Sequence, residues 1–173
     1  VMLKTIVLIG MMGSGKTSVG KELAKKLNLD FIDIDQEIEK KYEMTISEIF
    51  QTKGEHYFRK IEENMSCKLI NGKPCVISIG GGGFINIKVR NKIKIDGISI
   101  WINTGLEKIY KRLNKSKNKR PLLNYKKLKQ SIKEIYNKRK PIYKKANYTI
   151  QTKSDNKKFI VEKIIKKLWK KYL

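Results

Sequence analysis

The chain has 173 residues, of which 40 are Lys or Arg and 16 are Asp or Glu, giving a formal net charge of +24 at pH 7. This length suffices for one well-buried core and is too short for two ordinary domains. No apolar run approaches the length of a membrane span and no signal-peptide pattern is visible, so we expect a single cytoplasmic domain without a membrane partner.

The excess of positive charge lies in the second part of the chain. Up to Glu63 there are 10 basic and 11 acidic residues, whereas from Asn64 onward there are 30 and 5. Such a charge is typical of proteins that bind nucleic acid. The excess is lysine spread along predicted helices, however, without a basic patch interleaved with aromatic residues. We therefore interpret it as a compositional bias on solvated faces and expect no nucleic-acid partner.

Arginine is scarce in this basic chain, which makes each arginine informative. If a bias fills indifferent basic positions with lysine, the remaining arginines are candidates for positions where only a planar, bidentate fork would serve. The five arginines are Arg59, Arg90, Arg112, Arg120 and Arg139.

Residues 10–17 read GMMGSGKT and match the phosphate-loop pattern G-x-x-x-x-G-K-[ST]. The apolar run 3–9 before them predicts a buried strand, and residues 18–27 after them predict an amphipathic helix. Glycines let backbone N–H groups turn toward an anion, and the helix presents its positive end to the same place. Lys16 can then reach the β- and γ-phosphates, and Thr17 can ligate Mg²⁺. The sequence therefore predicts a site for a nucleoside triphosphate.

Two carboxylates end the next predicted strand, residues 30–35, which read DFIDID. Alternation along a strand would place Asp33 and Asp35 on the same side, provided that the extended geometry persists. One could hold the metal through water, and the other could orient a substrate hydroxyl. A helix cap is the alternative role, because Asp35 precedes a predicted helix over 36–42, and both roles can hold at once.

Further elements follow in α/β alternation. A capping box at 45–48 opens a helix that Gly54 ends, and a longer helix over 55–70 carries Arg59 near its start. Residues 75–83 read CVISIGGGG, a buried strand that runs into four glycines, so the backbone there is expected to approach another group closely.

The last part of the chain contains a lysine-rich polar stretch, 114–124, with Arg120 directly before a proline. We interpret it as a mobile lid over the nucleotide, with a plain solvated loop as the alternative. Five strands alternating with helices predict a parallel sheet covered on both faces. The other predicted elements are a helix over 86–95, a strand over 97–103, a helix from a capping box at 104–107 to about 113, a helix over 125–140, a strand over 148–150 and an amphipathic C-terminal helix capped at 154–155.

Six motifs follow one another along the chain: the phosphate loop, Asp33-Ile34-Asp35, Phe58-Arg59, Gly80-Gly81-Gly82, Arg120-Pro121-Leu122-Leu123 and Arg139-x-x-x-Tyr143. With these motifs in this order, the chain resembles the shikimate kinases over nearly its whole length. The resemblance implies a P-loop three-layer α/β sandwich of the nucleoside-monophosphate-kinase-like type, with a five-stranded parallel sheet and helices on both faces. It also implies one monomeric kinase domain over 1–173, with a lid at about 112–124 and a substrate-binding region at about 33–61.

The activity implied by the resemblance is transfer of the ATP γ-phosphoryl group to the 3-hydroxyl of shikimate, giving shikimate 3-phosphate and ADP in aromatic amino acid biosynthesis. Mg²⁺ is the implied cofactor. Catalytic roles are implied for Lys16, Asp35 and Arg120. The implied ligands are Gly13, Ser14, Gly15, Lys16, Thr17, Ser18, Arg112 and Arg120 for ATP; Asp35, Arg59, Gly81, Gly82 and Arg139 for shikimate; and Thr17 and, through water, Asp33 for the metal.

The residue types agree with this substrate, because two arginines suit a carboxylate and an aspartate suits vicinal hydroxyls. The set Asp35, Arg59 and Arg139 indicates an anionic polyol but does not fix the ring. A gluconate kinase of the same fold is therefore one alternative, and an ATP-dependent nucleic-acid-binding protein is another from a different class. Arg90 matches no position of the family, and we expect it to be a surface residue.

Overall fold

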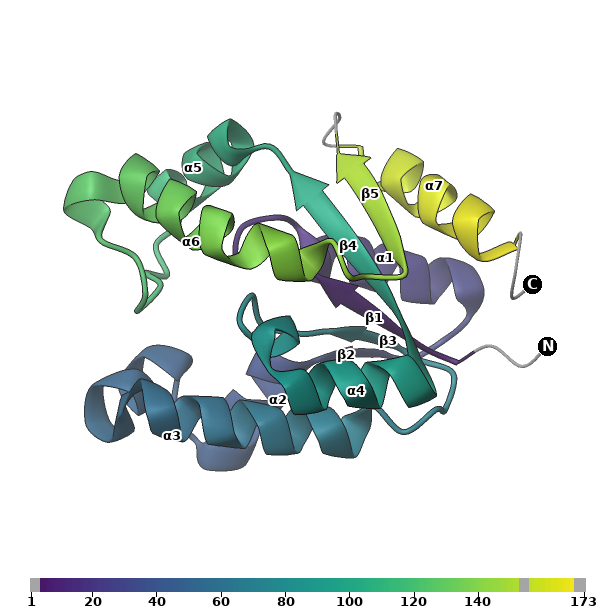
Figure 1. Cartoon of the computed structure of the whole chain (residues 1–173), viewed down its shortest axis with the longest axis horizontal. Helices are drawn as coiled ribbons and strands as arrows, with labels where there is room; N and C mark the ends of the chain where they lie inside the picture. Colours follow the sequence, from purple (N-terminus) through teal and green to yellow (C-terminus); the bar gives the residue numbers. More distant parts are fainter. Residues whose placement is uncertain (1–3, 153–155, 170–173) are drawn as a thin grey trace.

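The computed structural model describes residues 4–152 and 156–169. In these ranges five strands form one parallel sheet with the order β2-β3-β1-β4-β5 (Figure 1). The central strand β1 pairs with β3 on one side and β4 on the other, so that Leu8 lies opposite both Ser78 and Ile100. The strands are β1 (Thr5–Ile9), β2 (Phe31–Asp33), β3 (Val76–Ser78), β4 (Gly97–Thr104) and β5 (Tyr148–Thr152).

The apolar run 6–9 of β1 is explained by the place of this strand in the middle of the sheet. All five of its residues are buried, because both faces of the sheet are covered. Since side chains alternate along a strand, Val7 and Ile9 belong to one hydrophobic core, and Ile6 and Leu8 belong to the other. The three-layer sandwich expected from the sequence is confirmed.

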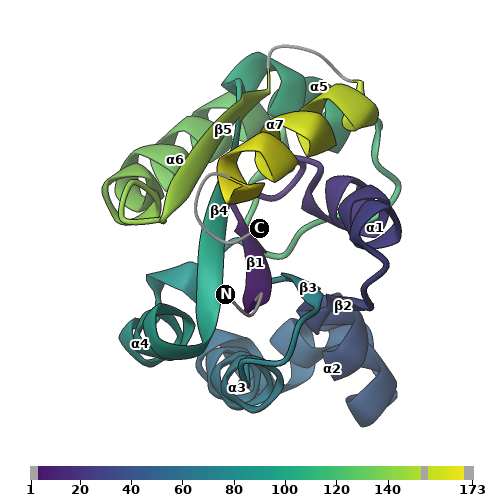
Figure 2. The ribbon, with the colours of Figure 1, turned by 90° about the vertical axis from the view of Figure 1, so that its right-hand side faces the viewer.

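The helices divide between the two cores. Helices α1 and α7 cover one face of the sheet, whereas α4 and α6 lie on the other (Figure 2). Among the helices of the described ranges, none combines the length and apolarity needed to cross a bilayer. The helices are α1 (Lys16–Leu27), α2 (Ile34–Tyr42), α3 (Ile46–Leu69), α4 (Ile87–Asp96), α5 (Leu106–Lys115), α6 (Leu128–Tyr143) and α7 (Lys157–Trp169), with short 3₁₀ helices η1 (Gly83–Ile85) and η2 (Tyr125–Lys127).

The strand predicted over 30–35 is shorter than expected. β2 ends at Asp33, which serves as the N-cap of α2 and accepts hydrogen bonds from the backbone N–H groups of Asp35 and Gln36. Asp35 lies in the first turn of the helix. The expectation that both carboxylates share one face of a strand is therefore wrong, because capping by Asp33 ends the extended geometry two residues early.

The two predicted capping boxes have different outcomes. Thr45 and Glu48 form a complete box at the start of α3. Thr104 does not cap α5, since its hydroxyl donates to the Ser14 carbonyl at 2.9 Å and pairs with the Thr152 hydroxyl at 2.8 Å. A tertiary contact thus takes the side chain that the local pattern assigned to a cap. Helix α5 begins after Gly105 without a side-chain cap.

The kink in α3 and the start of α7 can be compared with the helix ends predicted from the sequence. Gly54 has φ 81° and ψ 169° and kinks α3, which confirms the predicted end of the first helix there. The cap predicted for the C-terminal helix, at 154–155, lies outside the described residues. In the described part, the Asn156 side chain accepts hydrogen bonds from the N–H groups of Lys158 and Phe159 at the start of α7.

Candidate active site

The phosphate loop joins β1 to α1 and is closed by its own lysine. Gly13 and Gly15 have φ 74° and 94°, which residues with side chains rarely adopt, and Gly15 is the N-cap of α1. The buried Lys16 ammonium donates to the carbonyls of Gly10 and Met11, at 2.9 Å each. Burial lowers the pKa of Lys16 to about 8, and the carboxylates of Asp35 and Asp33 oppose this effect.

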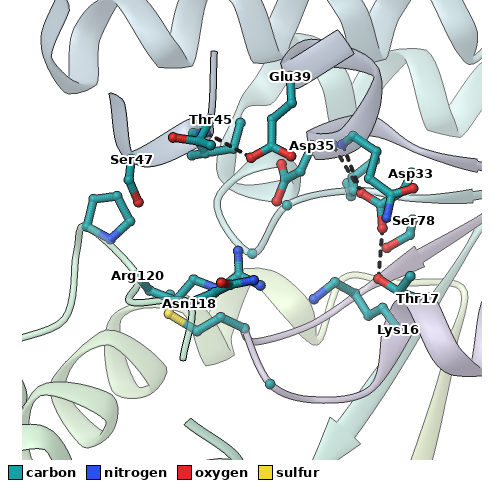
Figure 3. Close-up of a pocket in the computed structure, with 18 of the residues that line it drawn as sticks. Lys16, Thr17, Asp33, Asp35, Glu39, Thr45, Ser47, Ser78, Asn118 and Arg120 are labelled. Atoms are coloured by element: carbon teal, nitrogen blue, oxygen red, sulfur yellow. Dashed lines mark hydrogen bonds between the residues drawn. The ribbon is translucent and has the colours of Figure 1, made fainter. Parts of the chain in front are cut away.

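A hydroxyl and a carboxylate meet beside this loop. The Thr17 hydroxyl donates to Asp33 Oδ2 at 2.7 Å (Figure 3). Both are oxygen ligands of the kind that Mg²⁺ prefers. No group of three or more His, Cys, Asp or Glu that could hold a metal occurs in residues 4–152 and 156–169. These donors therefore fit a Mg²⁺ ion that is shared with substrate phosphates and water, and do not form a closed protein cage.

Asp35 faces the same cleft from the first turn of α2. Its side chain is half-buried, and its Oδ1 atom has no hydrogen-bond partner among the described protein atoms. Burial raises the pKa of Asp35 to about 6, with Glu62 and Asp33 adding to the rise and Lys16 and Arg120 opposing it. A carboxylate that titrates near neutral pH is suited to accept a proton from a hydroxyl.

The cleft that these residues line has a volume of about 770 Å³. It is bounded on one side by the segment between α5 and η2, from which Arg120 extends toward Lys16 (Figure 3). Among the contacts of this segment, the Ser47 hydroxyl donates to the Lys119 carbonyl at 3.3 Å, and the Arg120 N–H donates to the Tyr125 hydroxyl at 2.9 Å. The segment that we expect to be a lid therefore borders the cleft.

A second, smaller cavity of about 60 Å³ adjoins the cleft, and both are lined by Asp35, Gly81 and Arg120. Guanidinium groups from two helices line it, Arg59 from α3 and Arg139 from α6. Guanidinium groups, each of which can donate two parallel hydrogen bonds, are suited to binding a carboxylate. We call this cavity the acid pocket and define it by Asp35, Arg59, Glu62, Gly81, Gly82 and Arg139.

Glu62 is a member of the acid pocket that the sequence reasoning missed. Its side chain is only 3% exposed and pairs with Arg59 Nη1 through Oε2 at 2.6 Å, while its Oε1 has no partner among the described protein atoms. Burial raises the pKa of Glu62, and the neighbouring Arg59 opposes the rise. A signal was present, because residues three apart on a helix lie on one face and an Arg–Glu pair at this spacing interacts.

The glycine run after β3 is the wall on which both guanidinium groups rest. A Cβ atom at Gly82 would overlap Arg59 Nη1, and one at Gly81 would lie 2.8 Å from Arg139 Nη1. A Cβ at Gly80 would meet Glu62 Oε1 at 2.5 Å. The close backbone approach expected from the four glycines is confirmed, and the groups that approach are charged side chains.

Two arginines lie outside the cavities and bind backbone. Arg112 Nη1 donates to the Gly13 carbonyl at 2.9 Å and so ties α5 to the phosphate loop. Arg90 Nη1 donates to the carbonyls of Phe84 and Ile85, at 2.9 and 2.6 Å. The expectation that Arg90 is a plain surface residue is wrong, because this half-buried side chain anchors η1, which follows the glycine run.

The residues implied by the resemblance converge at one edge of the sheet, and most of them line the two cavities. The exceptions are Ser14, which is buried with its carbonyl bonded to Thr104, and Arg112. The residues on the cavity walls are Gly13, Gly15, Lys16, Thr17, Ser18, Asp33, Asp35, Arg59, Gly81, Gly82, Arg120 and Arg139.

Comparisons with known proteins agree with this arrangement. The profile of the family described as "Shikimate kinase" matches residues 12–169. A shikimate kinase of Persephonella marina is 44% identical over 163 residues, which cover 94% of this chain and 98% of the relative. The solved shikimate kinase of Acinetobacter baumannii in complex with shikimate has a TM-score of 0.94 at 35% identity, covering 99% of this chain and 96% of that one.

A more distant likeness concerns the fold alone. A gluconokinase from Sinorhizobium meliloti has a TM-score of 0.56 at 14% identity, with 98% of each chain covered. This likeness gives no support to a gluconate substrate, whereas the family profile and the relatives at about two-fifths identity cover almost the whole chain. The chain therefore belongs to the shikimate kinase family.

Proposed function

We propose that this chain transfers the γ-phosphoryl group of ATP to the 3-hydroxyl of shikimate, giving shikimate 3-phosphate and ADP for aromatic amino acid biosynthesis. The observation that carries the proposal is the acid pocket, in which the guanidinium groups of Arg59 and Arg139 stand beside Asp35 and open into the cleft of the phosphate loop. A solved family member is described in complex with shikimate, which supports this choice of acceptor.

The acceptor half of the reaction is assigned to the acid pocket. Arg59 and Arg139 bind the carboxylate of shikimate, and the backbone of Gly81 and Gly82 contacts the ring. Asp35 binds the ring hydroxyls and accepts the proton of the attacking one. Its raised pKa, about 6, leaves it ionised at neutral pH yet more basic than an ordinary aspartate.

The donor half is assigned to the phosphate loop. Residues 13–18 cradle the phosphates of ATP, and Lys16 moves from the carbonyls of its own loop to the β- and γ-oxygens. Arg120 adds positive charge from the lid, and Arg112 lies beside the nucleotide. Because phosphoryl transfer needs little covalent help from the protein, positioning and charge neutralisation supply most of the catalysis.

Mg²⁺ is the proposed cofactor, with Thr17 as a direct ligand and Asp33 acting through water. The metal would neutralise charge on the phosphate oxygens. The hydrogen bond of 2.7 Å between these two side chains supports the choice, since it places the two oxygens side by side. Activity that survives removal of divalent cations with a chelator would contradict it.

We further propose one kinase domain over 1–173, with the lid at about 112–124 and the substrate-binding region at about 33–61. The first four lid residues belong to the end of α5. The chain is proposed to act as a monomer in the cytoplasm, with ATP and shikimate as its partners and without nucleic acid. The monomer is the state that the resemblance to the shikimate kinases implies.

The direct test measures ADP release by the purified protein with ATP and Mg²⁺, with and without shikimate. Release should require both shikimate and Lys16, so the Lys16→Ala variant serves as the control. Arg139→Lys should mainly raise the KM for shikimate, because an ammonium cannot replace a bidentate fork. Activity on gluconate without activity on shikimate would refute the proposed substrate and favour the alternative, a gluconate kinase of the same fold.

A further inference from the structure

The hydroxyl of Tyr143 has a partner in the wall of the acid pocket. Tyr143 is the last residue of α6, one turn after Arg139, and it is among the largest fully buried side chains of the described residues. Its ring packs against Trp101, with centroids 5.7 Å apart, and its hydroxyl donates to the Gly81 carbonyl. One helix therefore supplies both a charge of the pocket and a hydrogen bond to the wall behind it.

Gly81 lies where the two halves of the site meet. A Cβ atom on this residue would be 2.8 Å from Arg139 Nη1, 3.3 Å from the Met12 nitrogen and 3.4 Å from the Gly10 carbonyl. The backbone of Gly81 thus separates the acid pocket from the start of the phosphate loop. A shift of this peptide would change the spacing between the group that holds the substrate's carboxylate and the loop that holds the phosphates.

A buried phenol at this position calls for an explanation beyond packing. A phenylalanine would fill the same space without burying a hydroxyl, which is costly unless the hydroxyl is bonded. Burial raises the pKa of Tyr143 to about 12, with Arg139 opposing the rise, so the hydroxyl stays a donor at every working pH.

We propose that Tyr143 is a positioning residue of the phosphoryl transfer: by holding the Gly81 carbonyl from the helix that carries Arg139, it fixes the spacing between the acid pocket and the phosphate loop. The inference rests on the proposed function, because it assumes that a carboxylate of the acceptor binds to Arg139. Tyr143 itself lies behind the wall and acts through Gly81 and Arg139.

The test is the Tyr143→Phe variant, which keeps the ring and its packing on Trp101 and removes only the hydroxyl. We expect kcat/KM for shikimate to fall about tenfold, since small displacements of a positioning group are expensive in phosphoryl transfer. The KM for ATP should change less than about twofold, because Thr104 and Arg112 hold the phosphate loop through the carbonyls of Ser14 and Gly13.

Tyr136→Phe is the matched control. Tyr136 lies on the same helix, and its hydroxyl also makes one hydrogen bond, to Asn103 Oδ1 at 3.4 Å, but it does not line the acid pocket. Its removal should leave kcat/KM for shikimate within about twofold of the wild type. Thermal unfolding of both variants, measured alongside, establishes that folded proteins are compared.

A double-mutant cycle with Arg139→Lys separates positioning from a general structural role. If Tyr143 acts through Arg139, the effect of Tyr143→Phe should shrink to less than about twofold in the Arg139→Lys background. Equal losses toward ATP and shikimate, full additivity in the cycle, or failure of Tyr143→Phe to fold would each overturn the proposal. A wild-type protein without shikimate turnover in the same assay would instead refute the proposed function.

Discussion

Asp35 should make the folded protein less stable at the pH at which it works, so Asp35→Asn should stabilise the fold while it abolishes activity. Burial raises the pKa of this carboxyl from 3.8 to about 6. Each pKa unit corresponds to about 1.4 kcal/mol, so at pH 8 the ionised side chain reduces the free energy of unfolding by up to about 3 kcal/mol. Asparagine has a similar shape and no charge, and so removes this penalty.

The sign of the effect fixes its pH dependence. Since the folded-state pKa is the higher one, the penalty is complete above about pH 6, shrinks as the pH falls and vanishes below the unfolded value of 3.8. The gain from Asp35→Asn should therefore fall to about 1.5 kcal/mol at pH 5, half of its value at pH 8. Turnover with shikimate should drop more than about 100-fold at either pH, because the proposed base is lost.

The measurement is urea unfolding of wild type and variant at both pH values. Asp30→Asn is the matched control, because Asp30 is an exposed aspartate just before β2 and lines neither cavity. This control should give the same small difference at pH 5 and pH 8. If Asp35→Asn were no more stable than the wild type at pH 8, or if its gain did not change with pH, the assignment of a half-buried carboxylate with a raised pKa would be refuted.

Three further outcomes are expected from the site. The value of kcat/KM for shikimate should fall about tenfold per pH unit below about pH 6, where Asp35 is protonated, and should fall again above about pH 8, where Lys16 loses its charge. A value of kcat/KM that stays constant between about pH 5 and 9 would contradict both roles. Gly82→Ala should raise the KM for shikimate more than about tenfold without changing the KM for ATP, because the new methyl group would displace the Arg59 guanidinium. Gly105→Ala is the control and should have no such effect, since a Cβ at Gly105 meets nothing within 4 Å. Arg90→Met keeps the apolar stem but leaves two carbonyls of η1 without their donor, so urea unfolding should show a decrease of about 1–2 kcal/mol in the free energy of unfolding. An unchanged unfolding midpoint would show that water bonds to these carbonyls equally well.

Much of the fold could be predicted because its signals are local. The run of β1, the glycines of the phosphate loop and the capping box at Thr45 each depend on neighbouring residues, and the structure contains all three. One wrong prediction involves a side chain whose hydrogen-bond partners are distant in the sequence. Thr104 has the pattern of a cap, but its hydroxyl bonds to the Ser14 carbonyl and Thr152, contacts that only the assembled sheet creates.

The acid pocket shows the same division. The arginines stood out in a lysine-rich sequence, and all five of them contact backbone or line the two cavities. Which arginines lie in the same cavity depends on how α3 and α6 pack. The sequence pattern does not specify this packing. Glu62 was missed because its spacing from Arg59 is equally common in exposed ion pairs, and its burial follows only from the contact with the glycine run.

Because β1 lies in the middle of the sheet, the acid pocket and the phosphate loop are held mainly from opposite sides of this strand. This separation bears on how the acceptor specificity of such a kinase can change. Three of the five charged side chains that line the acid pocket, those of Asp35, Arg59 and Glu62, come from α2 and α3, which follow the edge strand β2 along the chain (Figure 1). The phosphate loop is held instead from the β4 side, through Thr104 and Arg112. Under the proposed function, substitutions in the segment from α2 to α3 can therefore reshape acceptor recognition while the contacts of Thr104 and Arg112 with the phosphate loop are preserved. Divergence confined to that segment offers a short route by which one ancestral scaffold yields kinases for different small molecules.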